Sequence, residues 1–155
     1  MEKLTLDTGI KEYQINDGIL RFNPADPNVY ARFLEMQKRL EEIADESQRR
    51  LSSIDTEGIT DEEAGILGIE KCKGLDAELK AMFSHTFGEG NNFDEILGGV
   101  SFFAISTSGR WVVEELLLLL QPIVNEGAQS CLKRKADAAV QQAEMNRAQR
   151  RADQK

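Results

Sequence analysis

The chain has 155 residues and a mass of 17.4 kDa, a size that a single domain accommodates. Hydrophobic residues make up 41% and charged residues 30%, a composition typical of a water-soluble globular protein. The net charge of −8 argues against general nucleic-acid binding, and two cysteines with one histidine are too few for a disulfide framework or a structural zinc site. Nothing in the composition indicates a cofactor.

Two features of the sequence predict a cytoplasmic protein. The opening residues, MEKLTLDTGIKEY, contain no apolar stretch of signal-peptide length. The most apolar run, Trp111 to Val124, is interrupted by Glu114, Glu115 and Gln121 and is too short to span a bilayer.

Residues 1–23 are predicted to form a small β-hairpin. Residues 11–22 (KEYQINDGILRF) contain two strand-like stretches around an Asp-Gly pair, which favours a tight turn because both positions tolerate positive φ. Leu4 and Leu6 are candidates for a third short strand. Because an isolated hairpin is barely stable in water, this one is expected to pack on helices or to pair with another chain.

Residues 27–51 are predicted to form a long amphipathic helix. Asp26 is a favourable N-cap, and Pro27 suits the first helical position because its missing N–H is not needed there. An apolar stripe repeats at intervals of three and four residues, whereas the other faces are charged. The stripe consists of Phe33, Met36, Leu40 and Ile43.

A polar stretch over residues 52–59 predicts a loop, and residues 60–83 are predicted to form a second helix. Thr60 and Glu63 have the spacing of a capping box, in which each side chain satisfies a backbone donor of the other residue. Three glycines within the helix weaken it or allow a neighbouring backbone to approach closely. The positions expected to face inward are Ile66, Ile69, Cys72, Leu75, Leu79, Met82 and Phe83.

A glycine-rich loop over residues 84–93 and a short helical turn come next. Residues 100–105 (VSFFAI) are apolar and predict a buried turn or a helix start. A third main helix is predicted over residues 110–128, with a kink or a lost hydrogen bond at Pro122. Five leucines, Leu116 to Leu120, cover every face of this helix, which indicates burial on all sides or burial on one side and an oligomer contact on the other.

Charge is unevenly distributed along the chain. Residues 1–128 hold 12 Lys and Arg against 24 Asp and Glu, whereas residues 129–155 hold 7 against 3 and carry a net charge of +4. This C-terminal tail is helix-prone but has little to bury, so it is either an exposed helix or a tail that orders on binding. A basic tail on an acidic body indicates a segment that folds back or contacts an acidic partner. Its candidate contact residues are Lys133, Arg134, Lys135, Arg147, Arg150 and Arg151.

The sequence contains no constellation of residues that indicates catalysis. Ser84 and His85 are adjacent, and side chains so placed rarely converge as a nucleophile and its base. The GEGNN loop after Phe87 lacks the Lys and Ser/Thr of a phosphate-binding loop. Cys72 is expected to be a small core residue, and Cys131 has no catalytic partner. The acidic pairs fit solvated helix faces better than acid–base chemistry: Glu41 with Glu42, Asp61 with Glu62 and Glu63, and Glu114 with Glu115. We therefore expect no enzymatic activity.

Two sequence blocks carry a family resemblance. The first is KEYQIN followed by LRFNPADPNVYARFLEMQKRLEEI, and the second is FSHTFGEGNNFDEILGGVSFFAISTSGRWVVEELLLLLQPIV. The second block has an FGEG-type loop, a D-x-x-(L/F)-G turn and a closing apolar helix. With these motifs the chain resembles tail assembly chaperones of long-tailed phages and prophages. The resemblance covers roughly residues 4–128, without residues 52–59 and without the basic tail.

The resemblance implies a mostly helical, non-virion protein that works by binding in the cytoplasm of the bacterial host. Its expected partners are the tape measure protein, which such chaperones coat, the tail tube protein, which they bring to it, and further copies of the chain. The alternative is a structural tail completion or connector subunit retained in the virion. Apolar positions are the hypothetical sites of client binding or self-association, with core packing as the default for each: Phe33, Met36, Leu40, Ile43, Leu116, Leu117, Leu118, Leu119 and Leu120.

Together these elements predict a mainly α (α+β) fold. A single domain over residues 1–128 combines three main helices with a small N-terminal β-hairpin, and residues 129–155 form the helix-prone basic tail. The sequence leaves open whether the hairpin pairs within or between chains, and whether the protein forms a dimer or a ring.

Overall fold

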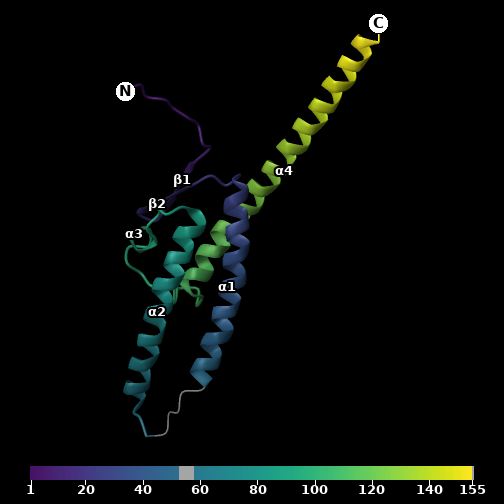
Figure 1. Cartoon of the computed structure of the whole chain (residues 1–155). Helices are drawn as coiled ribbons and strands as arrows, with labels where there is room; N and C mark the ends of the chain where they lie inside the picture. The colour runs from purple at the N-terminus through teal and green to yellow at the C-terminus, as the bar shows by residue number, and fades with distance from the viewer. Residues whose placement is uncertain (53–57, 155) are drawn as a thin grey trace.

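The structure, a computed structural model, describes residues 1–52 and 58–154, with the side chains of residues 47 and 50–52 left out of that description. The expected loop over residues 52–59 therefore lies mostly outside the described residues. The mainly α fold with a small hairpin is confirmed (Figure 1). The elements are β1 (Lys11–Ile15), β2 (Gly18–Phe22), α1 (Pro27–Ser52), α2 (Asp61–Phe87), α3 (Phe93–Ile96) and α4 (Val112–Asp153).

The two strands form an antiparallel hairpin, in which Tyr13 faces Leu20 across the sheet. The turn consists of Asn16 and Asp17, and of these only Asn16 has positive φ. The turn predicted at Asp17-Gly18 therefore lies one residue earlier in the chain. Gly18 instead begins β2, where a Cβ would lie 2.5 Å from the backbone of Ile96 in α3. No strand is found within residues 1–10, so the third strand expected at Leu4 and Leu6 is absent from this described segment.

The start of α1 confirms the predicted cap. Asp26 Oδ1 accepts the N–H of Asn28 at 2.9 Å, and the Asp26 carbonyl accepts the N–H of Tyr30. Phe33, Met36 and Ile43 are buried in the core, and Leu40 packs against it half-buried. The three- and four-residue spacing therefore identified the inward face of this helix correctly.

The capping box at the start of α2 is confirmed, because Thr60 Oγ1 accepts the Glu63 N–H and Glu63 Oε2 accepts the Thr60 N–H. The helix continues four residues beyond the expected end, as far as Phe87. Two of the positions expected to face inward were wrong: Ile66 is 52% exposed and Ile69 is 69% exposed. The apolar repeat continues there, but the first half of α2 has no core beneath it.

The three glycines of α2 do not mark a close helix contact. A Cβ built on Gly65, Gly68 or Gly74 would meet no described atom within 4 Å. Their effect is therefore to weaken the helix locally, by about 1 kcal/mol each relative to Ala.

A charged network joins the second half of α2 to α3 and to the turn after it. Lys80 Nζ, in a residue only 7% exposed, lies 2.6 Å from Asp94 Oδ1 and 3.0 Å from Asp76 Oδ2. Asp76 Oδ1 also accepts the Phe102 N–H at 2.7 Å. Burial lowers the pKa of Lys80, but its hydrogen bonds to Asp94 and Asp76 outweigh burial and leave the pKa raised. Residues 100–105 form the turn and not a helix start, with Phe102 buried completely.

Helix α4 is longer than expected and continuous. It runs through Pro122 and through the basic tail as far as Asp153, so the tail is helical where the structure describes it. Its first half packs on α1, with Gly127 close to Pro24 after β2, and its second half projects away from the body (Figure 1). Among the described residues, no helix combines the length and apolar character needed to cross a membrane.

Candidate interaction surfaces

The residues considered for catalysis do not converge on a reactive site. The Ser84 hydroxyl lies within hydrogen-bond distance of the carbonyls of Lys80 and Asn91, at 3.1 and 2.7 Å. The His85 side chain is 71% exposed, and its nearest charged neighbour is Glu89, 3.5 Å away. Serine and histidine therefore serve different contacts, and the serine hydroxyl closes the loop after α2.

The glycine-rich loop after α2 holds the hairpin in place through one buried side chain that the sequence analysis did not single out. Asn91 Oδ1 accepts the Arg21 N–H at 2.9 Å, while Asn91 Nδ2 donates to the Arg21 carbonyl at 2.8 Å and to the Phe87 carbonyl at 3.3 Å. Gly88 adopts φ +130°, which lets the loop turn back toward β2. The loop thus has a structural role, and an Asn in a glycine-rich turn was its only signal.

The paired carboxylates at the start of α4 act as local caps. Glu114 Oε2 accepts the Trp111 N–H at 3.0 Å, and Glu115 Oε1 accepts hydrogen bonds from Ser106 and Ser108. The hydrogen bonds from Ser108 and then Ser106 lower the pKa of Glu115. Within the described part of the chain, no group of three or more His, Cys, Asp or Glu side chains could hold a metal ion. Cys72 and Cys131 are free and half-buried.

The nine apolar positions considered for partner binding divide into two environments. Phe33, Met36, Ile43, Leu116 and Leu120 are each at most 3% exposed and belong to the intramolecular core, with Leu40 and Leu117 packed half-buried beside it. Leu118 and Leu119 are 53% and 61% exposed. Of the five consecutive leucines, the structure therefore leaves only this pair open to a partner, on the side of α4 that faces away from the core.

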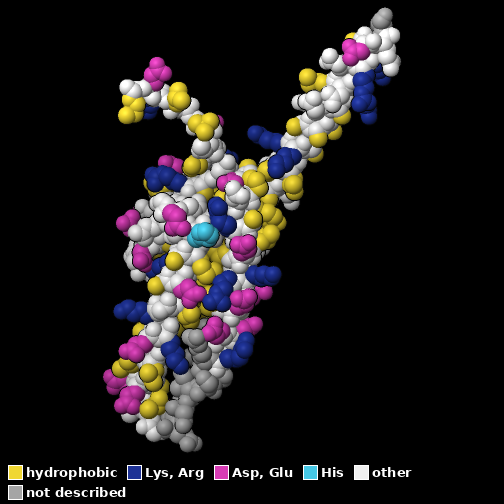
Figure 2. All heavy atoms as spheres, viewed as in Figure 1, with side chains coloured by type: hydrophobic (Ala, Val, Ile, Leu, Met, Phe, Trp, Pro, Cys, Tyr) yellow, Lys and Arg dark blue, Asp and Glu magenta, His cyan; other side chains and the backbone are white. Residues whose placement is uncertain are grey.

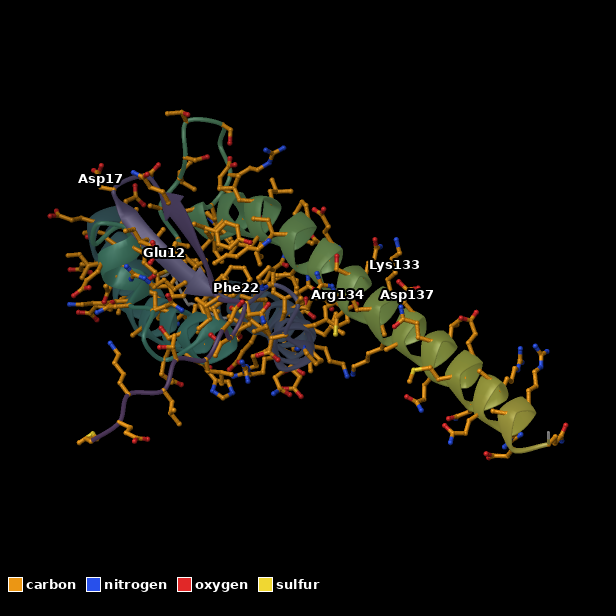
Figure 3. The ribbon with its side chains drawn as sticks, turned by 90° about the horizontal axis from the view of Figure 1, so that it is seen from above. Glu12, Asp17, Phe22, Lys133, Arg134 and Asp137 are labelled. Atoms are coloured by element: carbon orange, nitrogen blue, oxygen red, sulfur yellow. The ribbon has the colours of Figure 1, made fainter. Side chains whose placement is uncertain are left out.

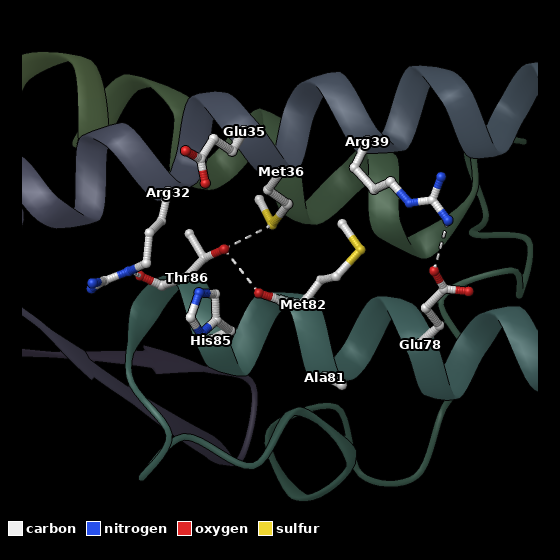
Figure 4. Close-up of a pocket in the computed structure, with 9 residues that line it drawn as sticks. All are labelled: Arg32, Glu35, Met36, Arg39, Glu78, Ala81, Met82, His85 and Thr86. Carbon is white, nitrogen blue, oxygen red and sulfur yellow. Dashed lines mark hydrogen bonds and ion pairs between the residues drawn. The ribbon is translucent and has the colours of Figure 1, made fainter.

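A groove with an apolar floor lies between α1 and α2, with a volume of about 480 Å³ (Figure 4). Met36, Ala81 and Met82 form its floor. Thr86, at the end nearer the hairpin, donates its hydroxyl to the Met82 carbonyl at 2.8 Å and lies 3.5 Å from Met36 Sδ. Met36 is buried in the core, so half-buried Met82 is the flexible methionine of the groove that a partner could reach.

The rim of this groove is charged on both sides. Arg39 lies 3.1 Å from Glu78 across the groove and 3.2 Å from Glu42 on its own helix. The hydrogen bond to Glu78, and then the one to Glu42, raise the pKa of Arg39. Arg32 Nε donates to the Thr86 carbonyl at 3.2 Å. Figure 4 shows Arg39 and Glu78 bridging the two helices beyond Met82. The cross-groove pair is exposed, so it contributes little to the stability of the fold.

The most exposed surface belongs to the second half of α4, residues 128–153, which we name the α4 extension. Apart from half-buried Ala128 and Cys131, every residue of this helix is exposed. Its larger apolar side chains, Leu132, Val140 and Met145, are 68%, 58% and 65% exposed. These three apolar side chains are therefore not covered by any other part of the chain that the structure describes.

The six basic residues singled out in the tail lie on the α4 extension. Lys133 and Arg134 lie beyond the hairpin, next to Asp137 (Figure 3). Dark-blue cationic side chains occur at the base and near the tip of the extension, where a magenta acidic group is also visible (Figure 2). The six candidate contact residues, all exposed, are Lys133, Arg134, Lys135, Arg147, Arg150 and Arg151. The extension thus combines positive charge with isolated apolar side chains.

Comparison of the chain with protein-family models, with curated proteins and with solved structures finds no match.

Proposed function

We propose that this protein is a tail assembly chaperone of a long-tailed phage or prophage, acting in the cytoplasm of the bacterial host. It binds the tape measure protein and helps recruit tail tube subunits, without catalysis. The observation that carries the proposal is the α4 extension, a helix exposed on nearly all sides that presents Leu132, Val140 and Met145 to solvent.

A long exposed helix is suited to a long helical client. Isolated helices gain little stability from propensity alone, so packing an apolar stripe against another helix stabilises both partners. The extension offers three exposed apolar side chains on different sides of the helix, and the groove between α1 and α2 offers apolar side chains within a charged rim. High surface charge keeps the chaperone in solution while the apolar positions remain free for the client.

Co-expression with the tape measure protein tests the proposal. We expect the client to become soluble and to co-elute with several copies of this chain in size-exclusion chromatography with light scattering. An insoluble client, together with a closed ring of this chain that is also present in purified virions, would instead support the alternative of a tail completion or connector subunit.

A variant of the extension separates client binding from folding. Leu132→Asp, Val140→Asp and Met145→Asp together place three charges on the apolar positions, and we expect at least a tenfold loss of client affinity. The matched control carries Gln129→Asp, Gln141→Asp and Gln149→Asp, which add the same charge to the same helix at polar positions. Equal affinity loss in both variants would show that net charge, and not the three apolar side chains, governs binding.

A further inference from the structure

The N-terminal segment, residues 1–10, is an extended stretch that points away from the body (Figure 1). Its two leucines are almost fully exposed, at 91% for Leu4 and 82% for Leu6. In an extended chain, residues two apart lie on one face, so Leu4 and Leu6 form an apolar face and Lys3, Thr5 and Asp7 form a polar one. This is the pattern of a half-buried strand that has no sheet of its own.

The hairpin has one closed edge and one open edge. Asn91 hydrogen-bonds both the N–H and the carbonyl of Arg21, which closes the outer edge of β2. Arg21 faces Glu12, and Ile19 faces Gln14, in the antiparallel register. These two pairs are non-hydrogen-bonded pairs of the antiparallel ladder, in which the N–H and C=O groups of both residues point away from the partner strand. The backbone groups of Glu12 and Gln14 therefore point away from β2, toward the open edge of β1. In the part of the chain that the structure describes, no hydrogen bond occupies those groups.

A hollow of about 510 Å³ lies beside β1 on the side of the core. Tyr13 of β1 and Ile123 and Gly127 of α4 line it. Burial, and then the negative charge of Glu126, raise the pKa of Tyr13, which is consistent with the phenol lying against α4. A strand added to the edge of β1 would direct alternate side chains toward this hollow, where they would meet Tyr13 and Ile123 beside the charged groups of Lys11, Glu126 and Arg134.

The segment does not reach its own open edge. Asn23 Nδ2 donates to the Thr8 carbonyl at 2.9 Å, and Gly9 N–H donates to Asp7 Oδ1 at 2.9 Å with Gly9 at φ +69°. These contacts anchor the base of the segment beside the residue that follows β2. To return along β1, the segment would have to break the hydrogen bond between Asn23 and Thr8, which holds its base beside the end of β2. The partner is therefore more readily another chain.

We propose that residues 3–7 of one copy add as a third strand to the open edge of β1 in a second copy, with Leu4 and Leu6 entering the hollow between β1 and α4. The segment and β1 match in length, at five residues each, and unpaired strand edges are the usual acceptors for such addition. The inference does not depend on the identity of the client. It makes self-association a property of the N-terminus, separate from the α4 extension.

Cysteine cross-linking tests the pairing directly in the full-length chain, with Cys72→Ser and Cys131→Ser as background. Thr5, Glu12 and Gln14 share the solvent face of the proposed three-stranded sheet. Chains with Thr5→Cys, mixed with size-tagged chains carrying Glu12→Cys or Gln14→Cys, are expected to form a covalent heterodimer under mild oxidation. The matched control is Ile19→Cys, which lies on the same face but one strand further away, and it is expected to cross-link at least fivefold less.

A chain that carries both Thr5→Cys and Gln14→Cys distinguishes the two possible acceptors. The proposal expects bridges between chains, whereas a bridge formed only within one chain would overturn it, because the segment would then pair with its own hairpin. Equal cross-linking by the Ile19→Cys control would also overturn it, since contact would then be non-specific.

Light scattering provides an independent readout. The wild-type chain is expected to be oligomeric, and Leu4→Asp with Leu6→Asp is expected to give a monomer with unchanged helical circular dichroism, because both side chains are exposed in the single chain. Leu132→Asp with Val140→Asp is the control and should remain oligomeric. A monomeric wild-type chain, or dissociation by the control alone, would contradict the proposal.

Discussion

The two halves of α4 belong to one continuous helix but lie in different surroundings. In the first half, Val113, Leu116, Leu120 and Val124 are at most 5% exposed and complete the core. In the α4 extension, nearly every side chain is exposed. The first half is therefore held by burial, whereas the second has only helix propensity and its continuity with the first half to support it. One continuous helix can thus complete the core with one half and leave the other half exposed, with the boundary near Gly127.

The largest effect is expected from a core leucine of the first half. Leu120→Ala should lower the free energy of unfolding by about 3 kcal/mol, because it removes a fully buried side chain and leaves a cavity. Leu119→Ala is the matched control on the adjacent, exposed position and should change stability by no more than about 0.5 kcal/mol. Urea unfolding followed by circular dichroism measures both. Equal losses would show that α4 is not oriented as described.

The second prediction concerns the point where the halves meet. A Cβ on Gly127 would lie 1.8 Å from the Pro24 carbonyl oxygen, so Gly127→Ala should cost about 2 kcal/mol through forced displacement of α4. Gly74→Ala, in α2 with nothing within 4 Å, should instead stabilise the chain by up to about 1 kcal/mol through helix propensity. Thermal unfolding of the two variants should therefore shift in opposite directions. A stabilising Gly127→Ala would contradict the close contact.

The third prediction concerns the extension itself. Val140→Ala should change the free energy of unfolding by less than about 0.5 kcal/mol, because the side chain is 58% exposed and makes no core contact. It should nevertheless weaken client binding measurably, by isothermal titration calorimetry. A large loss of stability would indicate that the extension packs on the body.

The smallest effect on stability is expected at Glu115, near the start of α4. The folded chain lowers the pKa of Glu115, so this carboxylate stabilises the fold at neutral pH, and its contribution is lost as the pH falls below the ordinary glutamate range. Glu115→Gln should therefore be slightly less stable than wild type at pH 7, with a difference that shrinks toward acidic pH. Ser108→Ala, which removes a donor to the same carboxylate, should show the same sign in pH-dependent unfolding curves.

Features that depend on residues close together in the chain were predicted correctly. The caps at Asp26 and Thr60 and the apolar stripe of α1 were correct because they depend on residues within one helical turn. Ile66 and Ile69 were misassigned because an apolar repeat does not reveal whether another element covers it. The end of α4 was left open for the same reason: the composition of the tail indicates helix propensity but says nothing of what surrounds it.

The candidate surfaces could be predicted only in part. The sequence identified the basic residues of the extension, and it included Leu118 and Leu119 among the apolar candidates. It could not separate those two leucines from buried Leu116 and Leu120, because helical phase relative to the core depends on how α4 packs. The groove between α1 and α2 and the contact between Gly127 and Pro24 join residues far apart in the chain, so no local signal revealed them.

Amide hydrogen exchange of the full-length chain, alone and with the tape measure protein, tests the central claim most directly. In the free protein we expect strong protection over residues 113–127 and weak protection over the α4 extension, because only the first half is covered by a core. Adding the client should raise protection in the extension and leave the first half unchanged. Equal protection of both halves in the free protein, or an extension that the client leaves unprotected, would contradict the account.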